Sequence, residues 1–199
     1  MHLFFSTPVW IEQINHFESI NSELKNYIYQ EQEKNPHGVK KSNFNGWHSE
    51  GFDLKNENLK NFVYEISKNI GVAVNDMGWD LEAQIVKITS MWAIINKNGA
   101  FNERHHHGHS ALSAAYYVKA KENAGNIVFF DPRQANVFHH PSATKANNLN
   151  GQVQSITPKT GTLVLFPSYL EHKVEENLSG EERIVVSFNV SLFRKKDLI

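Results

Sequence analysis

Residues 101–119 read FNERHHHGHSALSAAYYVK, and this stretch decides how the second half of the chain folds. Its end, from Leu112 onward, is predicted to be a β-strand because it is short and contains Tyr and Val. Its beginning holds four of the eleven histidines of the chain, between His105 and His109. Side chains of an extended strand alternate between its faces, so His105, His107 and His109 are expected to share one face. The stretch therefore indicates either a metal site next to a strand or a solvated loop rich in histidine.

The rest of the chain alternates short apolar runs with turn signals such as Asn98-Gly99 and Asn150-Gly151. Besides 112–119, the candidate strands are 83–96, 126–130, 152–156, 161–166 and 182–193. Apolar residues spaced by three and four predict two earlier helices, over 14–34 and 54–71, with Gly71 as the stop of the second. The predicted fold is mainly β with α: a jelly roll, or double-stranded β-helix, braced by N-terminal helices. We expect a single domain over 1–199, with helical support in 1–80 and the core in 83–193.

Composition narrows the range of functions. The chain has 199 residues, a net charge of -1 and no cysteine, which excludes disulfides, thiolate metal sites and cysteine nucleophiles. The balanced charge argues against a duplex nucleic acid as partner. No run approaches the roughly 18 apolar residues of a membrane span, and the start lacks the basic region of a signal peptide. We therefore expect a soluble cytoplasmic protein without membrane contact.

A metal held by two histidines of one strand needs a further ligand from elsewhere, and His172 is the candidate, since it follows the strand at 161–166. His48, beside Trp47, is interpreted as a packing residue. His139 and His140 are predicted to lie in a loop.

The strand at 182–193 carries an unexpected charge. With a period of two, Arg183 and Ser187 share one face with Val185, while Ile184 takes the apolar face. An arginine that points into a barrel is costly unless an anion meets it, and its planar fork suits a carboxylate. The alternatives are a buried ion pair with an internal Asp or Glu and a place on an exposed edge.

A histidine pair, a distal histidine and an arginine about ten residues further on resemble the pattern of the 2-oxoglutarate/Fe(II)-dependent oxygenases. The resemblance covers about residues 85–193, and the TPVW opening and the NGWHS loop are also similar to one branch of that family. Its segments follow in register: WAIIN (92–96), FNERHHHGHS (101–110), LSAAYYV (112–118), GNIVFFDPR (125–133), GTLVLFPSYLEHKV (161–174) and ERIVVSFN (182–189).

The resemblance implies a set of roles. Fe(II) would be bound by His105, His107 and His172, although the second ligand of the superfamily is usually a carboxylate; His109 and Asp131 are the alternatives. The distal carboxylate of the cosubstrate 2-oxoglutarate would bind Arg183. The same group would be contacted by Ser187, Tyr117 and Asn96.

The implied reaction uses Fe(II), 2-oxoglutarate and O2 to hydroxylate an unidentified substrate, with release of succinate and CO2. The substrate is expected to be a small molecule or a protein side chain, and the oligomeric state stays open. The alternative is a cupin-like metalloprotein, a dioxygenase or isomerase, that does not use 2-oxoglutarate. Three histidine ligands suit that alternative, whereas an inward Arg183 with Ser187 argues against it.

Overall fold

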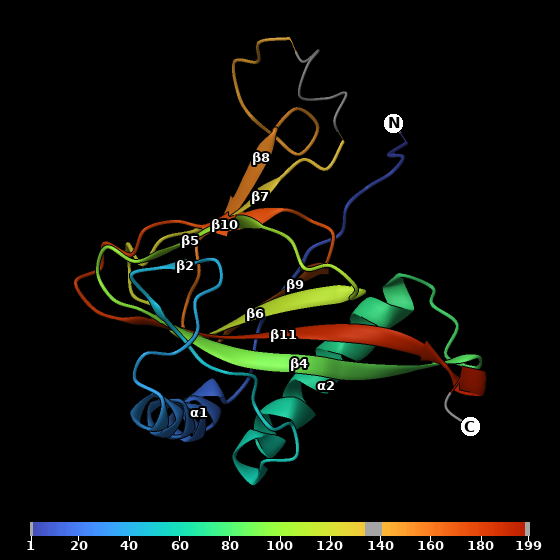
Figure 1. Cartoon of the computed structure of the whole chain (residues 1–199). Helices are drawn as coiled ribbons and strands as arrows, with labels where there is room; N and C mark the ends of the chain where they lie inside the picture. Colours follow the sequence, from blue (N-terminus) through green and yellow to red (C-terminus); the bar gives the residue numbers. More distant parts are fainter. Residues whose placement is uncertain (1, 134–140, 198–199) are drawn as a thin grey trace.

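A computed structural model describes residues 2–133 and 141–197 and shows two facing antiparallel sheets with two helices under the larger sheet (Figure 1). The larger sheet has the order β1-β9-β6-β11-β4-β3, and the smaller one β2-β5-β10-β7-β8. The helices are α1 (Phe17–Lys34) and α2 (Lys60–Asp76), with short 3₁₀ turns η1 (Glu57–Leu59) and η2 (Lys195–Asp197). The strands are β1 (Trp10–Gln13), β2 (Asn43–Phe44), β3 (Trp47–His48), β4 (Gln84–Asn96), β5 (Phe101–His105), β6 (Leu112–Lys119), β7 (Ile127–Phe130), β8 (Val153–Ile156), β9 (Thr162–Pro167), β10 (His172–Val174) and β11 (Arg183–Arg194).

The predicted double-stranded β-helix with supporting helices is confirmed. All six predicted strands are present, with ends that differ from the prediction by no more than about one residue. The strands β1, β2, β3, β5 and β10 were not predicted as separate strands. Four of these five have only two to four residues, too few to show an alternating pattern. The histidine pair His139 and His140 lies outside the described residues.

The two faces of the larger sheet bury different side chains. On β11, Ile184, Val186 and Phe188 pack against the helices in one apolar cluster. Val185 points the other way, into a second cluster between the sheets that contains Phe129 of β7. This alternation places Arg183 and Ser187 in the space between the sheets, as the period of two predicts.

Both helices differ from their predicted limits. The first begins at Phe17, not at residue 14, because His16 before it has a left-handed backbone with φ 54°. The second does not stop at Gly71, where a side chain would meet nothing within 4 Å of its Cβ. The apolar stripe continues through buried Ala73 and Val74, so packing carries the helix on to Asp76. In the part of the chain that the structure describes, no helix combines the length and apolar character that crossing a membrane requires.

A buried hydrogen-bonded pair fastens α1 to the larger sheet. The Tyr116 hydroxyl of β6 donates to Asn21 Oδ1 of α1 at 2.7 Å, and Asn21 Nδ2 donates to the Val118 carbonyl at 2.9 Å. Tyr116→Phe removes the donor and leaves the amide oxygen buried without its partner, so we expect a loss of about 1–3 kcal/mol in the free energy of unfolding. Urea unfolding measures this loss. The control Tyr64→Phe, at a side chain that is 65% exposed, should change the free energy by less than about 0.5 kcal/mol.

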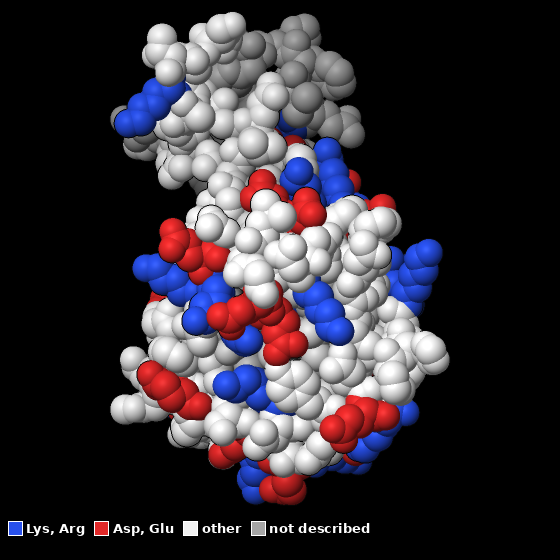
Figure 2. Space-filling model, turned by 90° about the vertical axis from the view of Figure 1, so that its left-hand side faces the viewer, with Lys and Arg blue, Asp and Glu red and all other residues white. Residues whose placement is uncertain are grey.

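The surface shows no large region of one charge on the face seen in Figure 2, where Lys and Arg lie among Asp and Glu. This mixture agrees with the net charge of -1. The β7 and β8 strands project from the body as an arm (Figure 1).

Candidate functional site

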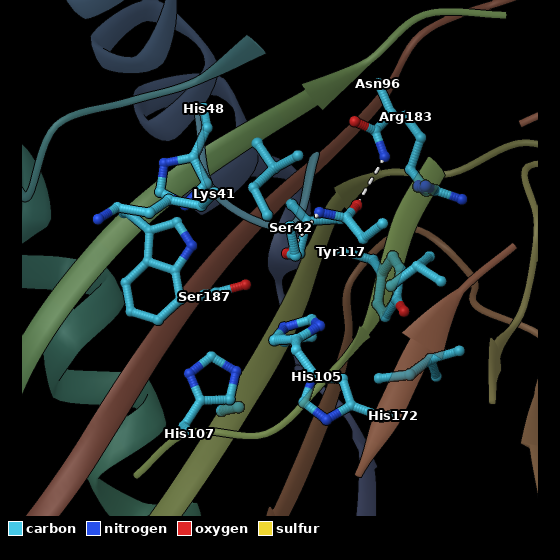
Figure 3. Close-up of a pocket in the computed structure, with 18 of the residues that line it drawn as sticks. Lys41, Ser42, His48, Asn96, His105, His107, Tyr117, His172, Arg183 and Ser187 are labelled. Carbon is cyan, nitrogen blue, oxygen red and sulfur yellow. Dashed lines mark hydrogen bonds between the residues drawn. The ribbon is translucent and has the colours of Figure 1, made fainter. Parts of the chain in front are cut away.

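A cavity of about 410 Å³ lies between the two sheets and contains the residues that the sequence singled out. Figure 3 shows its polar side chains: three histidines lie together, and Arg183 lies apart from them with Asn96. Of the described residues, its lining comprises Lys41, Ser42, His48, Trp92, Ile94, Asn96, Asn102, His105, His107, Ala114, Ala115, Tyr117, Ile127, Phe166, His172, Val174, Arg183, Val185 and Ser187.

The histidine group is formed by two segments far apart in the sequence. His105 ends β5 and stands directly opposite His172 of β10 in the antiparallel pair. His107 follows β5 and is fastened by its backbone N–H, which donates to the Ser168 carbonyl at 3.0 Å. One ligand atom of each of these three histidines lies within 4.8 Å of the others. Three imidazole nitrogens at this spacing can surround one divalent ion.

The alternative ligands lie elsewhere. His109 has a left-handed backbone with φ 67° and lines a separate surface hollow beside Trp79. The Asp131 carboxylate, just past β7, pairs with Arg133 at 2.8 Å and does not line the cavity. The left-handed turn at His109 breaks the extended run, so the strand alternation ends before that residue.

Backbone carbonyls orient two of the three rings. His105 Nδ1 donates to the Glu103 carbonyl at 2.7 Å, and His172 Nδ1 donates to the Leu170 carbonyl at 3.0 Å. A carbonyl only accepts, so the hydrogen of each neutral ring sits on Nδ1 and the lone pair on Nε2. This arrangement is typical of metal-binding histidines, which donate their other ring nitrogen to a fixed acceptor.

The histidines stay neutral at ordinary pH. Burial, with the neighbouring histidines, lowers the pKa of His172 to about 3 and that of His107 to about 4. Burial also lowers the pKa of His105. Neutral imidazoles keep their lone pairs free, and a metal ion needs these lone pairs.

Arg183 is a buried cation with an unused donor. Its side chain is 1% exposed, and its Nη1 donates to the backbone carbonyls of Ala124 and of Glu175, the latter at 3.2 Å. Gly125, with φ 85°, permits this approach, since a Cβ there would lie 2.8 Å from Nη1. Among the described residues, Nη2 has no hydrogen-bond partner and no carboxylate pairs with the guanidinium. The two alternatives from the sequence, a buried ion pair and a place on an exposed edge, therefore do not describe the surroundings of Arg183.

Tyr117 and Asn96 lie at the Arg183 end of the cavity. Burial raises the pKa of Tyr117 to about 12, although the charge of Arg183 opposes this shift, so the phenol is neutral and can donate. Asn96 stands opposite Arg183 across β4 and β11. Its Nδ2 donates to Asn102 Oδ1 at 2.9 Å, while its Oδ1 is buried without a partner in the described part of the chain.

Ser187 lies in the same cavity but away from Arg183. It pairs with Trp92 across β4 and β11, and Figure 3 shows its side chain between His48 and His107, away from Arg183. It lies four positions along β11 from Arg183, so the two backbones are roughly 13 Å apart at about 3.3 Å per residue. The two backbones are thus far apart along the cavity, and the expected shared contact with the cosubstrate stays a prediction.

Among the lining residues that carry a hydrogen-bonding side chain, five were not predicted as site residues: Lys41, Ser42, His48, Trp92 and Asn102. His48 does pack, as expected, because it stacks on Trp92 with ring centroids 5.8 Å apart. Trp92 in turn stacks on His107, with ring centroids 5.6 Å apart. His48 is thus a packing residue that also forms part of the cavity wall. The sequence signal that could have indicated His48 as a site residue was the NGWHS motif, which contains it.

The fold and the site together define a jelly-roll protein with a candidate metal centre and a buried arginine in one cavity. Residues 90–189 match the family model described as "Putative 2OG-Fe(II) oxygenase", and the chain belongs to this family. It is thus a 2-oxoglutarate- and Fe(II)-dependent oxygenase, with O2 as the other cosubstrate. No curated protein sequence matches the chain.

Solved structures share the fold at low sequence identity. A Pseudomonas putida prolyl-4-hydroxylase is 15% identical with a TM-score of 0.66, over 94% of this chain and 93% of that chain. A prolyl hydroxylase from Trichoplax adhaerens, in complex with a hypoxia inducible factor peptide fragment, is 13% identical with a TM-score of 0.63, over 96% and 86%. HygX from Streptomyces hygroscopicus, with nickel, 2-oxoglutarate and hygromycin B bound, is 10% identical with a TM-score of 0.62, over 93% and 83%.

Proposed function

We propose that His105, His107 and His172 bind the Fe(II) of this oxygenase and that Arg183 binds the distal carboxylate of 2-oxoglutarate. The observation that carries the proposal is the unpaired Nη2 of Arg183, buried in the cavity that holds the three neutral histidines. A buried guanidinium without a counterion is costly, and a dicarboxylate from solution removes that cost when it binds.

The residues fit both groups. Three neutral nitrogen ligands suit ferrous iron and leave the positions that the cosubstrates need. When bound, Fe(II) supplies the oxygen chemistry: it couples the conversion of 2-oxoglutarate and O2 into succinate and CO2 to hydroxylation of a substrate C–H bond.

The surrounding side chains position the cosubstrate. Tyr117, as a neutral phenol, donates a hydrogen bond to the carboxylate that Arg183 holds, and Asn96 offers a further polar contact beside it. Apolar walls formed by Val185, Ile127 and Phe166 limit the access of water to the same space. Ser187, Trp92 and His48 line the same cavity away from Arg183 and would face the substrate.

The substrate class stays broad in this proposal: a small molecule or a protein side chain. The structural relatives bind both kinds, since one holds a peptide fragment and another hygromycin B. The balanced surface in Figure 2 favours neither a duplex nucleic acid nor another strongly charged polymer. The cytoplasm is the proposed location, because a reducing compartment keeps iron ferrous.

A direct test uses purified, Fe(II)-loaded protein under anaerobic conditions. Addition of 2-oxoglutarate should produce the visible charge-transfer band of the chelated keto acid. Admission of O2 together with a library of small molecules and peptides should then release succinate above the substrate-free rate for a compound that fits. A wild-type protein that holds iron but produces no band would contradict the proposal and favour a metalloprotein that does not use 2-oxoglutarate.

A further inference from the structure

The lining of the cavity has an unequal distribution of charge. Among the described residues it contains two permanent cations, Arg183 and Lys41, and no Asp or Glu. Figure 3 shows these two cations on opposite sides of the cavity, with Arg183 beside Asn96 and Lys41 beside His48. Once 2-oxoglutarate occupies Arg183, the lysine is the remaining permanent charge that faces the space left for a substrate.

The backbone around Lys41 is held in place. Its N–H donates to Asn43 Oδ1 at 2.8 Å, and Asn43 Nδ2 donates to the Gly46 carbonyl at 2.7 Å. The next residue, Ser42, accepts from the backbone N–H of Glu103 at 2.8 Å and from Asn102 Nδ2 at 3.3 Å. The segment is therefore fastened to β5, the strand that carries His105.

The side chain itself is available to a ligand. No described carboxylate lies within ion-pair distance of the Lys41 amine, whereas Lys119 and Lys121 both pair with Glu181. Figure 3 shows the Lys41 side chain running alongside His48, with the amine at the outer end, away from the histidine group. Ser187 adds a hydroxyl on the same side of the cavity, with no hydrogen-bond partner of its own among the described residues.

We propose that the oxidised substrate carries an anionic group, a carboxylate or a phosphate, that binds Lys41 at the mouth of the cavity. The inference rests on the proposed function, because it requires Arg183 to be occupied by 2-oxoglutarate. The substrate then lies with its anionic end at Lys41 and with the C–H bond to be oxidised toward the three histidines. Ser187 and His48 flank this path and contribute polar contacts.

The expected contribution of Lys41 is moderate because the amine is exposed to solvent. A hydrogen bond to a charged group weakened by solvent screening corresponds to a change of roughly five- to fifty-fold in affinity. Lys41→Gln should show this loss, and Lys41→Arg should recover most of the affinity, since it keeps the charge. Lys40→Gln is the matched control: it removes the same charge one residue earlier, at an exposed side chain that does not line the cavity.

The experiment uses the full chain loaded with paramagnetic Co(II), saturated with 2-oxoglutarate and kept anaerobic. The probes are phenyl phosphate, followed by ³¹P line broadening, and carboxyl-labelled benzoate, followed by ¹³C line broadening; benzamide is the neutral comparison. We expect at least one anion to be broadened by the wild type, five- to fifty-fold weaker binding in Lys41→Gln, and wild-type binding in Lys40→Gln. The anion whose signal is broadened identifies phosphate or carboxylate as the preferred anionic group.

Three results would overturn the inference: no broadening of either anion, equal affinity in Lys41→Gln, or an equal loss in Lys40→Gln. Binding of 2-oxoglutarate is measured in the same samples by the change in the Co(II) absorption spectrum. If 2-oxoglutarate binds while the anions fail to bind through Lys41, the proposed function stands and only the anionic substrate is wrong. If the metal-loaded wild type does not bind 2-oxoglutarate, both proposals fall.

Discussion

Arg183→Ala is expected to bind iron with almost unchanged affinity and to lose 2-oxoglutarate. The side chain lies apart from the histidine group in Figure 3, and its Nη2 is a buried donor without a partner among the described residues. Truncation leaves a carboxylate of the cosubstrate unpaired, and such a loss costs about 2–5 kcal/mol, or roughly 30- to several-thousand-fold in affinity. Arg183→Lys should recover only part of this affinity, because an ammonium lacks the planar fork.

Anaerobic titration of the iron-loaded protein with 2-oxoglutarate measures this effect through the charge-transfer band. Arg194→Ala is the matched control, because Arg194 ends the same strand and pairs with Asp197 at the surface. Its titration should match that of the wild type. Equal binding of 2-oxoglutarate by Arg183→Ala and the wild type would remove the arginine from the cosubstrate site.

The fold was predictable wherever an element was long enough to show its period. β4 and β11 are twelve or more residues long, and their limits were predicted within one residue. β10 has three residues, and only its neighbours β5 and β7 define it as a strand. The end of α2 depends on the buried contacts of Val74, which a glycine at position 71 does not indicate.

Site residues could be predicted where the sequence places an unusual combination of metal-binding or charged side chains at a regular spacing. Adjacent histidines and an arginine on an apolar strand are unusual, and the structure brings them into one cavity. Lys41 and Asn102 have ordinary side chains, and only the pairing of β2 with β5 places them at the cavity. Ser187 shows a limit of this reasoning: it shares a strand face with Arg183, but three strand residues lie between them, so a shared face alone does not establish a shared ligand.

The histidine group allows a sharper test of the metal site. His172→Ala or His105→Ala removes one of three nitrogen ligands, and neither ring has a nearby carboxylate to replace it among the residues that the structure describes. Changes to residues that merely support a metal ligand cost 10- to 100-fold in affinity, so loss of a ligand should exceed about 100-fold. Competition titration with a chelator of known affinity measures the metal affinity of each variant.

His107 and His109 decide which residue of the extended run completes the site. His107 lies beside His172, with ring centroids 5.3 Å apart, whereas His109 turns away in a left-handed conformation with φ 67°. His107→Ala should therefore weaken iron binding severely, and His109→Ala should leave it at the wild-type level. Both positions follow β5, so a general disturbance of this segment would lower the metal affinity of both variants alike. If His107→Ala bound iron with normal affinity while His109→Ala lost it, the assignment would be reversed. His109, and not His107, would then be the third iron ligand, which the left-handed turn at His109 in this structure does not allow.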